Sequence, residues 1–172
     1  VALSDCEPDV CQMEALLLQK AAHVMVKCSP MLDISQALAQ LTSVREVHVV
    51  SVNNECKELL LVLGGRAGGG VSVCTVNFHG NHVHTFDFTY EEEQEAQCIY
   101  TAAVGRYLYE PNSSMMKAGC FRLPALRYGL EKLHRNTHLY TSDILLPDFP
   151  GRDFKVKSVD GFGKNELKRL SS

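Results

Sequence analysis

Three histidines lie within six residues of one another, His79, His82 and His84. Imidazole nitrogens are common zinc ligands, and a short hairpin would bring the three rings toward one turn. A zinc site needs at least three convergent ligands, and structural sites need four. The nearby Asp87 falls on the opposite face of the predicted strand from His82 and His84. We therefore expect these histidines on the surface of a hairpin, and no metal site.

The glycine-rich stretch GGRAGGG, residues 64–70, is a second candidate for chemistry. A phosphate-binding loop of this kind lies between a strand and a helix and ends in Lys-Ser or Lys-Thr. Here the next segment, VSVCTVNF, alternates like a strand, and no such pair follows. The stretch is therefore predicted to be a hairpin connection and to bind no phosphate.

The net charge of −3 hides an uneven distribution along the chain. Residues 1–110 hold 14 acidic and 6 basic side chains, whereas residues 111–172 hold 6 acidic and 11 basic ones. Such a basic end is compatible with RNA bound through its phosphates, and equally with a solvated basic surface. The candidate phosphate contacts are Lys117, Arg122, Arg127, Lys132, Arg135 and Arg152. Tyr107, Tyr109 and Tyr140 are candidates for stacking on unpaired bases or for the core.

A second group of candidate substrate-binding residues lies at the end of a predicted strand, His23–Lys27. Open α/β sheets bind ligands at the carboxyl ends of their parallel strands, which favours Lys27, Ser29 and Asp33. Lys27 would meet a phosphate and Ser29 a base edge. In the alternative interpretation Asp33 only caps the next helix, and the Lys27 stem lies along the surface.

Other function classes have little support in the sequence. Neither paired carboxylates nor a Ser/His/Asp or Cys/His arrangement occurs at a spacing typical of hydrolases. The composition, 45% hydrophobic and 22% charged, is that of an ordinary globular protein. No apolar run approaches the roughly 18 residues of a membrane span. Seven cysteines without a C-x-x-C pair favour a reduced, cytoplasmic location.

The periodicity predicts a mixed α/β fold. A helix over 10–21 precedes the strand 23–27, and a second helix begins after Asp33. Strands at 44–52 and 59–63 flank Asn53-Asn54, which tolerate the positive φ of a tight hairpin turn. Strands at 71–78 and 83–88 follow.

In the second half a helix is predicted from Tyr90, with Ala96, Ile99, Tyr100 and Ala103 as its buried stripe. A strand at 106–110 precedes a helix capped by Asn112 or Ser113, and Pro124 separates a further helix at 125–133. Short strands are expected at 138–141 and 154–157. Arg152 would be presented by the loop 148–152, and 164–170 has helical composition.

Long strings in the chain resemble a known family. SPMLDISQALAQL, VREVHVVSVNNECKELLLVL and RNTHLYTSDILLPDFPGRDF are similar to bacterial class I S-adenosylmethionine-dependent methyltransferases with a ferredoxin-like and THUMP-like C-terminal region. The resemblance implies that 1–88 is the C-terminal half of a Rossmann-like methyltransferase domain, whose sheet ends in an antiparallel hairpin. It also implies a small α+β ferredoxin-like domain at 89–143 and the truncated start of a THUMP-like segment at 144–172.

The resemblance further implies that the full-length protein uses S-adenosylmethionine. The chain lacks the glycine-rich turn and the ribose-binding acid of such enzymes, and it lacks the family's Asp-Pro-Ala-Arg-Arg run. We therefore expect this chain alone to bind no cofactor, to hold no catalytic residue and to be the substrate-recognition portion of an RNA methyltransferase.

Two alternatives remain open, a stand-alone RNA-binding module and a protein-interaction module. An edge strand at 23–27 would favour self-association, and we expect no membrane partner.

Overall fold

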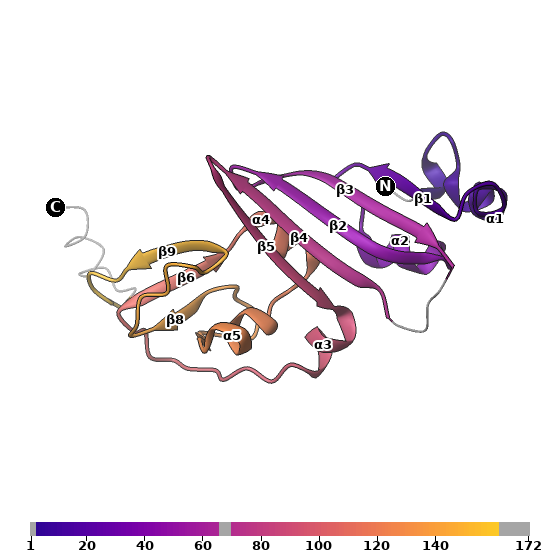
Figure 1. The fold of residues 1–172 in the computed structure, drawn as a ribbon. Helices are drawn as coiled ribbons and strands as arrows, with labels where there is room; N and C mark the ends of the chain where they lie inside the picture. Colours follow the sequence, from indigo (N-terminus) through magenta and orange to yellow (C-terminus); the bar gives the residue numbers. More distant parts are fainter. Residues whose placement is uncertain (1–2, 66–69, 162–172) are drawn as a thin grey trace.

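The computed structural model describes residues 3–65 and 70–161, which form two β-sheets joined by short helices (Figure 1). The elements of the first half are η1 Leu3–Asp5, α1 Val10–Lys20, β1 His23–Cys28, α2 Ile34–Gln40, β2 Val44–Val52, β3 Glu55–Gly64, β4 Ser72–His79 and β5 His82–Thr89. Those of the second half are α3 Tyr90–Glu95, β6 Tyr107–Pro111, α4 Ser113–Ala118, α5 Leu123–Tyr128, β7 Glu131–Lys132, β8 Tyr140–Ser142 and β9 Gly151–Lys155.

The first sheet has the strand order β1-β3-β2-β4-β5 and is mixed, as predicted. Strand β3 lies between β1 and β2 and is antiparallel to both, whereas β2 and β4 are parallel. The hairpin between β2 and β3 turns at Asn53 and Asn54, whose positive φ angles confirm the predicted left-handed turn. Asp33 also caps α2 as predicted, since its carboxylate accepts the Gln36 N–H at 2.9 Å.

The glycine-rich connection is not a hairpin, which corrects that prediction. Strand β3 is followed by another strand, β4, but the two do not pair, because β2 lies between them and bonds to both. The end of β3 and the start of β4 lie on either side of the start of β2. Its residues 66–69 lie outside the described residues.

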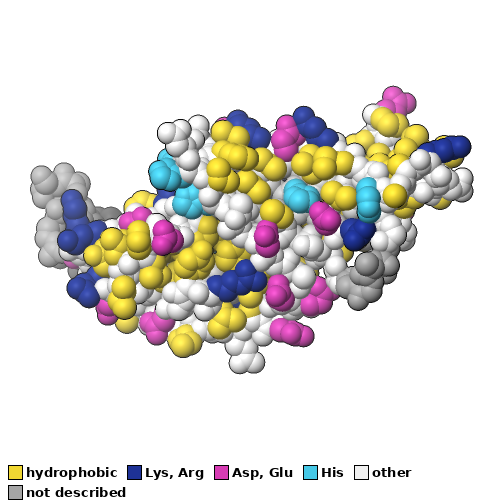
Figure 2. Space-filling view, in the orientation of Figure 1, with side chains coloured by type: hydrophobic (Ala, Val, Ile, Leu, Met, Phe, Trp, Pro, Cys, Tyr) yellow, Lys and Arg dark blue, Asp and Glu magenta, His cyan; other side chains and the backbone are white. Residues whose placement is uncertain are grey.

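One face of the first sheet is covered by α2 and α4, which lie on the same side of the strands (Figure 1). Alternate strand residues point into this layer and are fully buried, among them Val47, Val49, Leu61 and Val73. On the opposite face Val52, Phe78 and Val83 are neighbours on three strands, with exposed fractions of 38, 44 and 56%. Figure 2 shows hydrophobic side chains and histidines on this uncovered face.

Strand β1 is an edge of the sheet and has no partner on its outer side among the described residues. Its Met25 side chain is 64% exposed. Self-association through this edge stays a prediction, as does a cytoplasmic location. Within 3–65 and 70–161, no helix has the length and apolar character needed to span a membrane.

The second sheet has the order β7-β8-β6-β9. Its own small core contains Tyr109, Tyr140 and Phe149, with the rings of Tyr109 and Phe149 in edge contact at 5.2 Å. Because β9 pairs with β6, this sheet extends past residue 144, where the THUMP-like segment is expected to begin.

Two predicted helices are too long. Helix α3 ends at Glu95, and Ile99 and Tyr100, expected in a buried stripe, are 67 and 47% exposed. The backbone there is extended because Ile99 and Thr101 exchange hydrogen bonds with Lys132, which replace the helical ones. Helix α5 ends at Tyr128 because Gly129 adopts a left-handed conformation.

Gly151 is predicted to be essential for the pairing of β9 with β6. A Cβ at this position would clash with the carbonyl oxygen of Glu110 on the neighbouring strand. We expect Gly151→Ala to lower the free energy of unfolding in urea by about 2–3 kcal/mol. Gly65→Ala is the matched control, because no atom lies within 4 Å of its added Cβ. If the free energy of unfolding changes by less than about 0.5 kcal/mol in both variants, the close approach of Gly151 to the Glu110 carbonyl oxygen is contradicted.

Candidate nucleotide-binding cavity

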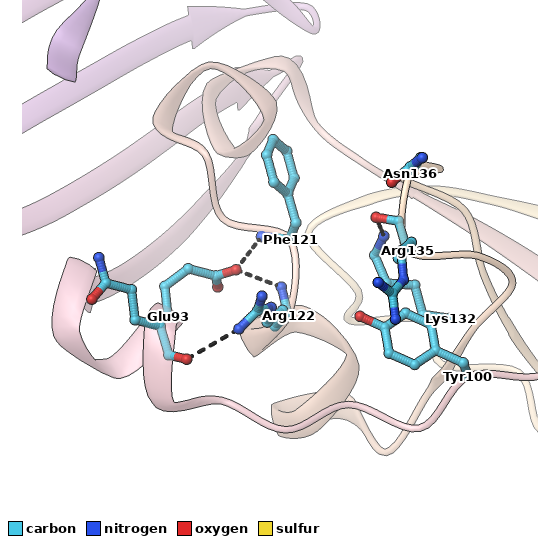
Figure 3. Close-up of a pocket in the computed structure, with 8 residues that line it drawn as sticks. Glu93, Tyr100, Phe121, Arg122, Lys132, Arg135 and Asn136 are labelled. Atoms are coloured by element: carbon cyan, nitrogen blue, oxygen red, sulfur yellow. Dashed lines mark hydrogen bonds between the residues drawn. The ribbon is translucent and has the colours of Figure 1, made fainter. Parts of the chain in front are cut away.

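A cavity of about 470 Å³ lies between the end of α3, the start of α5 and the loop after β7. Its walls come from segments far apart in the sequence, and they carry more positive than negative charge. Figure 3 shows Glu93 and Arg122 on one side and Tyr100, Lys132 and Arg135 on the other. The lining residues are Glu93, Gln94, Tyr100, Phe121, Arg122, Lys132, Arg135 and Asn136.

The Glu93 carboxylate builds the first wall. It accepts the backbone N–H groups of Phe121 at 3.0 Å, Arg122 at 2.8 Å and Leu123 at 3.0 Å, as dashed lines in Figure 3 show for the first two. These are the free donors at the start of α5, whose N-cap residue makes no side-chain cap of its own. A carboxylate of α3 thus caps α5 and fixes the position of the Arg122 backbone.

Lys132 builds the second wall. Its side chain is buried, and its ammonium group donates to the carbonyl oxygens of His134 at 2.9 Å, Arg135 at 3.0 Å and Thr137. Burial lowers the pKa of Lys132; Cys98 and Glu93 act in the opposite direction, and the positive charge of Arg122 adds to the lowering. The ammonium group therefore holds the loop that presents Arg135 and Asn136, and its donors are directed at that loop.

Phe121 and His138 form a stacked pair beside the cavity, with ring centroids 4.0 Å apart and planes inclined by 24°. The Phe121 carbonyl oxygen accepts the Tyr140 hydroxyl at 2.8 Å. His138 Nδ1 is buried without a hydrogen-bond partner in the described part of the chain. Burial and the Lys132 charge lower the pKa of His138, so its neutral form is favoured.

Two arginine side chains remain available to a ligand. Arg122 donates from one guanidinium nitrogen to the Gln94 carbonyl oxygen at 3.0 Å. For Arg135, no side-chain hydrogen bond or ion pair is formed with any residue of the described ranges. The pKa of the Tyr100 hydroxyl is raised, chiefly by a hydrogen bond with Cys98 and to a lesser extent by burial. The positive charges of Arg122 and Arg135 act to lower this pKa.

Four other predicted basic contacts are engaged within the protein. Lys132 is enclosed as described, and Lys117 donates to the Leu32 carbonyl oxygen at 2.7 Å. Arg127 donates to the Asp87 carbonyl oxygen at 2.7 Å and lies over the Phe86 ring. Arg152 lies on β9, not in a loop, and pairs with Glu110 across the sheet. Of the six predicted basic residues, Arg122 and Arg135 offer donors to the cavity.

The predicted substrate-binding residues at the end of β1 and just after it lie elsewhere. Lys27 forms an ion pair with Glu58 at 2.9 Å, and Ser29 Oγ accepts the Met31 N–H at 3.2 Å. Asp33 caps α2. Lys27 and Ser29 also line a mainly apolar cavity of about 380 Å³ beside α1. The fold does not bring this group to the cavity of Arg122 and Arg135.

Analysis of the sequence did not single out Glu93, Tyr100 or Asn136 as residues of a binding cavity. Tyr109 and Tyr140, candidates for base stacking, are fully buried. His79, His82 and His84 lie on the hairpin of β4 and β5. Within the described part of the chain, no three His, Cys, Asp or Glu side chains come together as possible metal ligands.

Comparison with known proteins gives a family match for part of the second half. Residues 107–150 match the model of a ferredoxin-like domain, which reaches from β6 to the residue before β9. The whole chain is similar to a crystal structure of a presumed methyltransferase from Porphyromonas gingivalis, with 38% identity and a TM-score of 0.92. The similarity covers 98% of this chain and 43% of that one.

Two curated proteins of Mycobacterium tuberculosis strains are also similar, each 24% identical over 154 residues. Both are described as uncharacterized S-adenosylmethionine-dependent methyltransferases. The alignment covers 89% of this chain and 40% of those proteins, so the chain spans less than half the length of these relatives.

Loss of the Glu93 cap is predicted to weaken the junction of α3 and α5. Glu93→Ala leaves three backbone N–H groups without their acceptor, and we expect the free energy of unfolding to fall by about 1–2 kcal/mol. Glu95→Ala, at an exposed site in the same helix, should change it by less than about 0.5 kcal/mol. Equal free energies of unfolding for the two variants in urea titrations would contradict the capping role of Glu93.

His138 is predicted to make stability depend on pH. Because its folded pKa lies below the usual value of about 6.5, the unfolded state binds more protons, and stability falls on acidification below that value. His138→Phe keeps a ring beside Phe121, and we expect a smaller fall between about pH 7 and pH 5. An unchanged slope in His138→Phe would refute this role.

Proposed function

We propose that this chain is the substrate-recognition portion of an S-adenosylmethionine-dependent RNA methyltransferase and itself lacks the cofactor site. The similarity to the presumed methyltransferase, 38% identity along almost the whole chain, carries the proposal. The curated relatives support it, since both are described as dependent on S-adenosylmethionine. Methyl transfer would then be an activity of a longer protein that contains this chain.

The first sheet supports an assignment to the C-terminal half of a Rossmann-like methyltransferase domain. An antiparallel strand, β3, lies between two strands that run parallel to each other, as the resemblance implies. The open edge of β1 and its exposed Met25 offer surface on which further protein would pack. We assign the cofactor half to that position.

The second half supports RNA as the substrate class. Arg122 and Arg135 face one cavity, and a partly exposed tyrosine lies with them. Guanidinium groups bind phosphates, and aromatic rings stack on unpaired bases. The THUMP-like assignment of 144–172 stays part of this proposal, with 162–172 outside the described residues.

Binding experiments on the chain test both parts of the proposal. We expect a single-stranded RNA of about 12 nucleotides to bind in fluorescence anisotropy, with an affinity that falls between about 50 and 200 mM salt. Calorimetry should detect no S-adenosylmethionine binding at up to about 1 mM. Cofactor binding by this chain would overturn the missing cofactor site, and a chain that binds no RNA would overturn the substrate class.

Methyl transfer is tested on the native polypeptide. An antibody against the chain should detect a band well above 19.1 kDa, the mass of the chain alone. We expect that protein to transfer a labelled methyl group to total RNA. Label in protein alone would overturn the RNA substrate, and a native band at 19.1 kDa would favour a stand-alone binding module.

A further inference from the structure

We propose that the cavity beside α3 binds one unpaired nucleotide of RNA, with its phosphate between Arg122 and Arg135 and its base on Tyr100. The proposal rests on the proposed function and adds a site to it. The observation behind it is a cavity of about 470 Å³ with charged, aromatic and amide groups on facing walls (Figure 3). That volume is in the range of sites for small organic ligands.

The charges of the cavity favour an anion. Three cations, Arg122, Lys132 and Arg135, line it together with one carboxylate, Glu93. Both Glu93 oxygens already accept backbone N–H groups of 121–123, which ties the carboxylate to α5. The Lys132 ammonium group is directed at three carbonyl oxygens. Among the charged groups of the cavity, the donors left for a ligand are therefore those of the two guanidinium groups.

Guanidinium groups are better matched in shape to a phosphate than ammonium groups are. Each offers parallel N–H donors that match two phosphate oxygens, which an ammonium group does not do. Arg122 keeps donors free beyond the one used for Gln94, and the Arg135 side chain bonds to none of the described residues. Figure 3 shows the Arg122 and Arg135 side chains on different sides of the cavity, and the proposed phosphate lies between them.

The remaining groups favour a nucleotide over inorganic phosphate. Tyr100 is 47% exposed, and its backbone is fixed by bridging to Lys132. A partly exposed aromatic ring on a fixed backbone is suited to stack on a base. The amide of Asn136 offers a donor and an acceptor to a base edge, and Lys132 fixes the loop that carries it. A phosphorylated side chain of a protein would leave the ring and the amide unused.

The test uses the full chain and three probes: uridine monophosphate, uridine and inorganic phosphate. In ¹H–¹⁵N spectra, addition of the monophosphate should shift the backbone amide signals of Tyr100, Arg122 and Asn136. Uridine, which lacks the phosphate, should bind far more weakly. Arg135→Ala should weaken monophosphate binding about tenfold or more. Tyr100→Ala should weaken binding of the monophosphate and leave binding of inorganic phosphate unchanged. Arg106→Ala is the matched control, an exposed arginine whose nearest ion-pair distance, to Asp143, is 3.9 Å.

The outcomes separate the site from the function. If RNA binds and Arg122→Ala and Arg135→Ala equal the parent chain, the site is wrong and the proposed function stands. If the monophosphate binds in the cavity and RNA does not bind, the proposed function and RNA as the ligand both fall, and the cavity is a site for free nucleotides. Competition by a phosphoserine peptide without any by the nucleotide would overturn the nucleotide assignment. Arg135→Lys, which keeps the charge but not the paired donors, replaces the alanine variant if that one fails to fold.

Discussion

The packing of α4 against the first sheet is the contact on which both halves of the structure depend. Met115, Ala118, Cys120 and Leu123 come from the second half, yet they are buried in the same hydrophobic cluster as the core residues of the first sheet. Removal of these side chains from the sheet would expose an apolar layer to water, which is the dominant cost of unfolding. The ferredoxin-like part therefore completes the core of the part before it.

Polar contacts at the same junction fix how α4 lies on the sheet. Asn112 is buried and caps α4 through the Met115 N–H, and the Ser113 N–H donates to Asn54 at the tip of the β2–β3 hairpin, at 2.7 Å. Asn77 on β4 in turn accepts the Asn54 N–H at 3.1 Å. Buried polar groups need such partners, so the network permits few other arrangements. The α3 wall of the cavity follows β5 directly, so the position of α3 depends on the sheet that this network joins.

Local signals in the sequence were enough for much of the fold and for little of the cavity. The Asn53-Asn54 turn, the Asp33 cap and a cap at Asn112 or Ser113 were predictable, because each is determined by residues a few positions away. The helix through Tyr100 was wrong because the competing hydrogen bonds come from Lys132, which is distant in sequence. Charge alone identified Arg122 and Arg135 together with Lys132, but it could not separate available donors from an ammonium group enclosed by carbonyls. That separation requires the fold of the loop after β7.

Under the proposed function, the position of the cavity limits its role in methyl transfer. Strand β1 and strand β5, which leads into α3, are the two opposite edges of the first sheet, and the other three strands lie between them. A cofactor half attached at β1 would therefore be separated from Arg122 and Arg135 by the width of the sheet. A nucleotide held between the two arginines would not be the one that receives the methyl group. The cavity would instead anchor the RNA at a distance from the target base, so that binding energy at one nucleotide positions another for reaction.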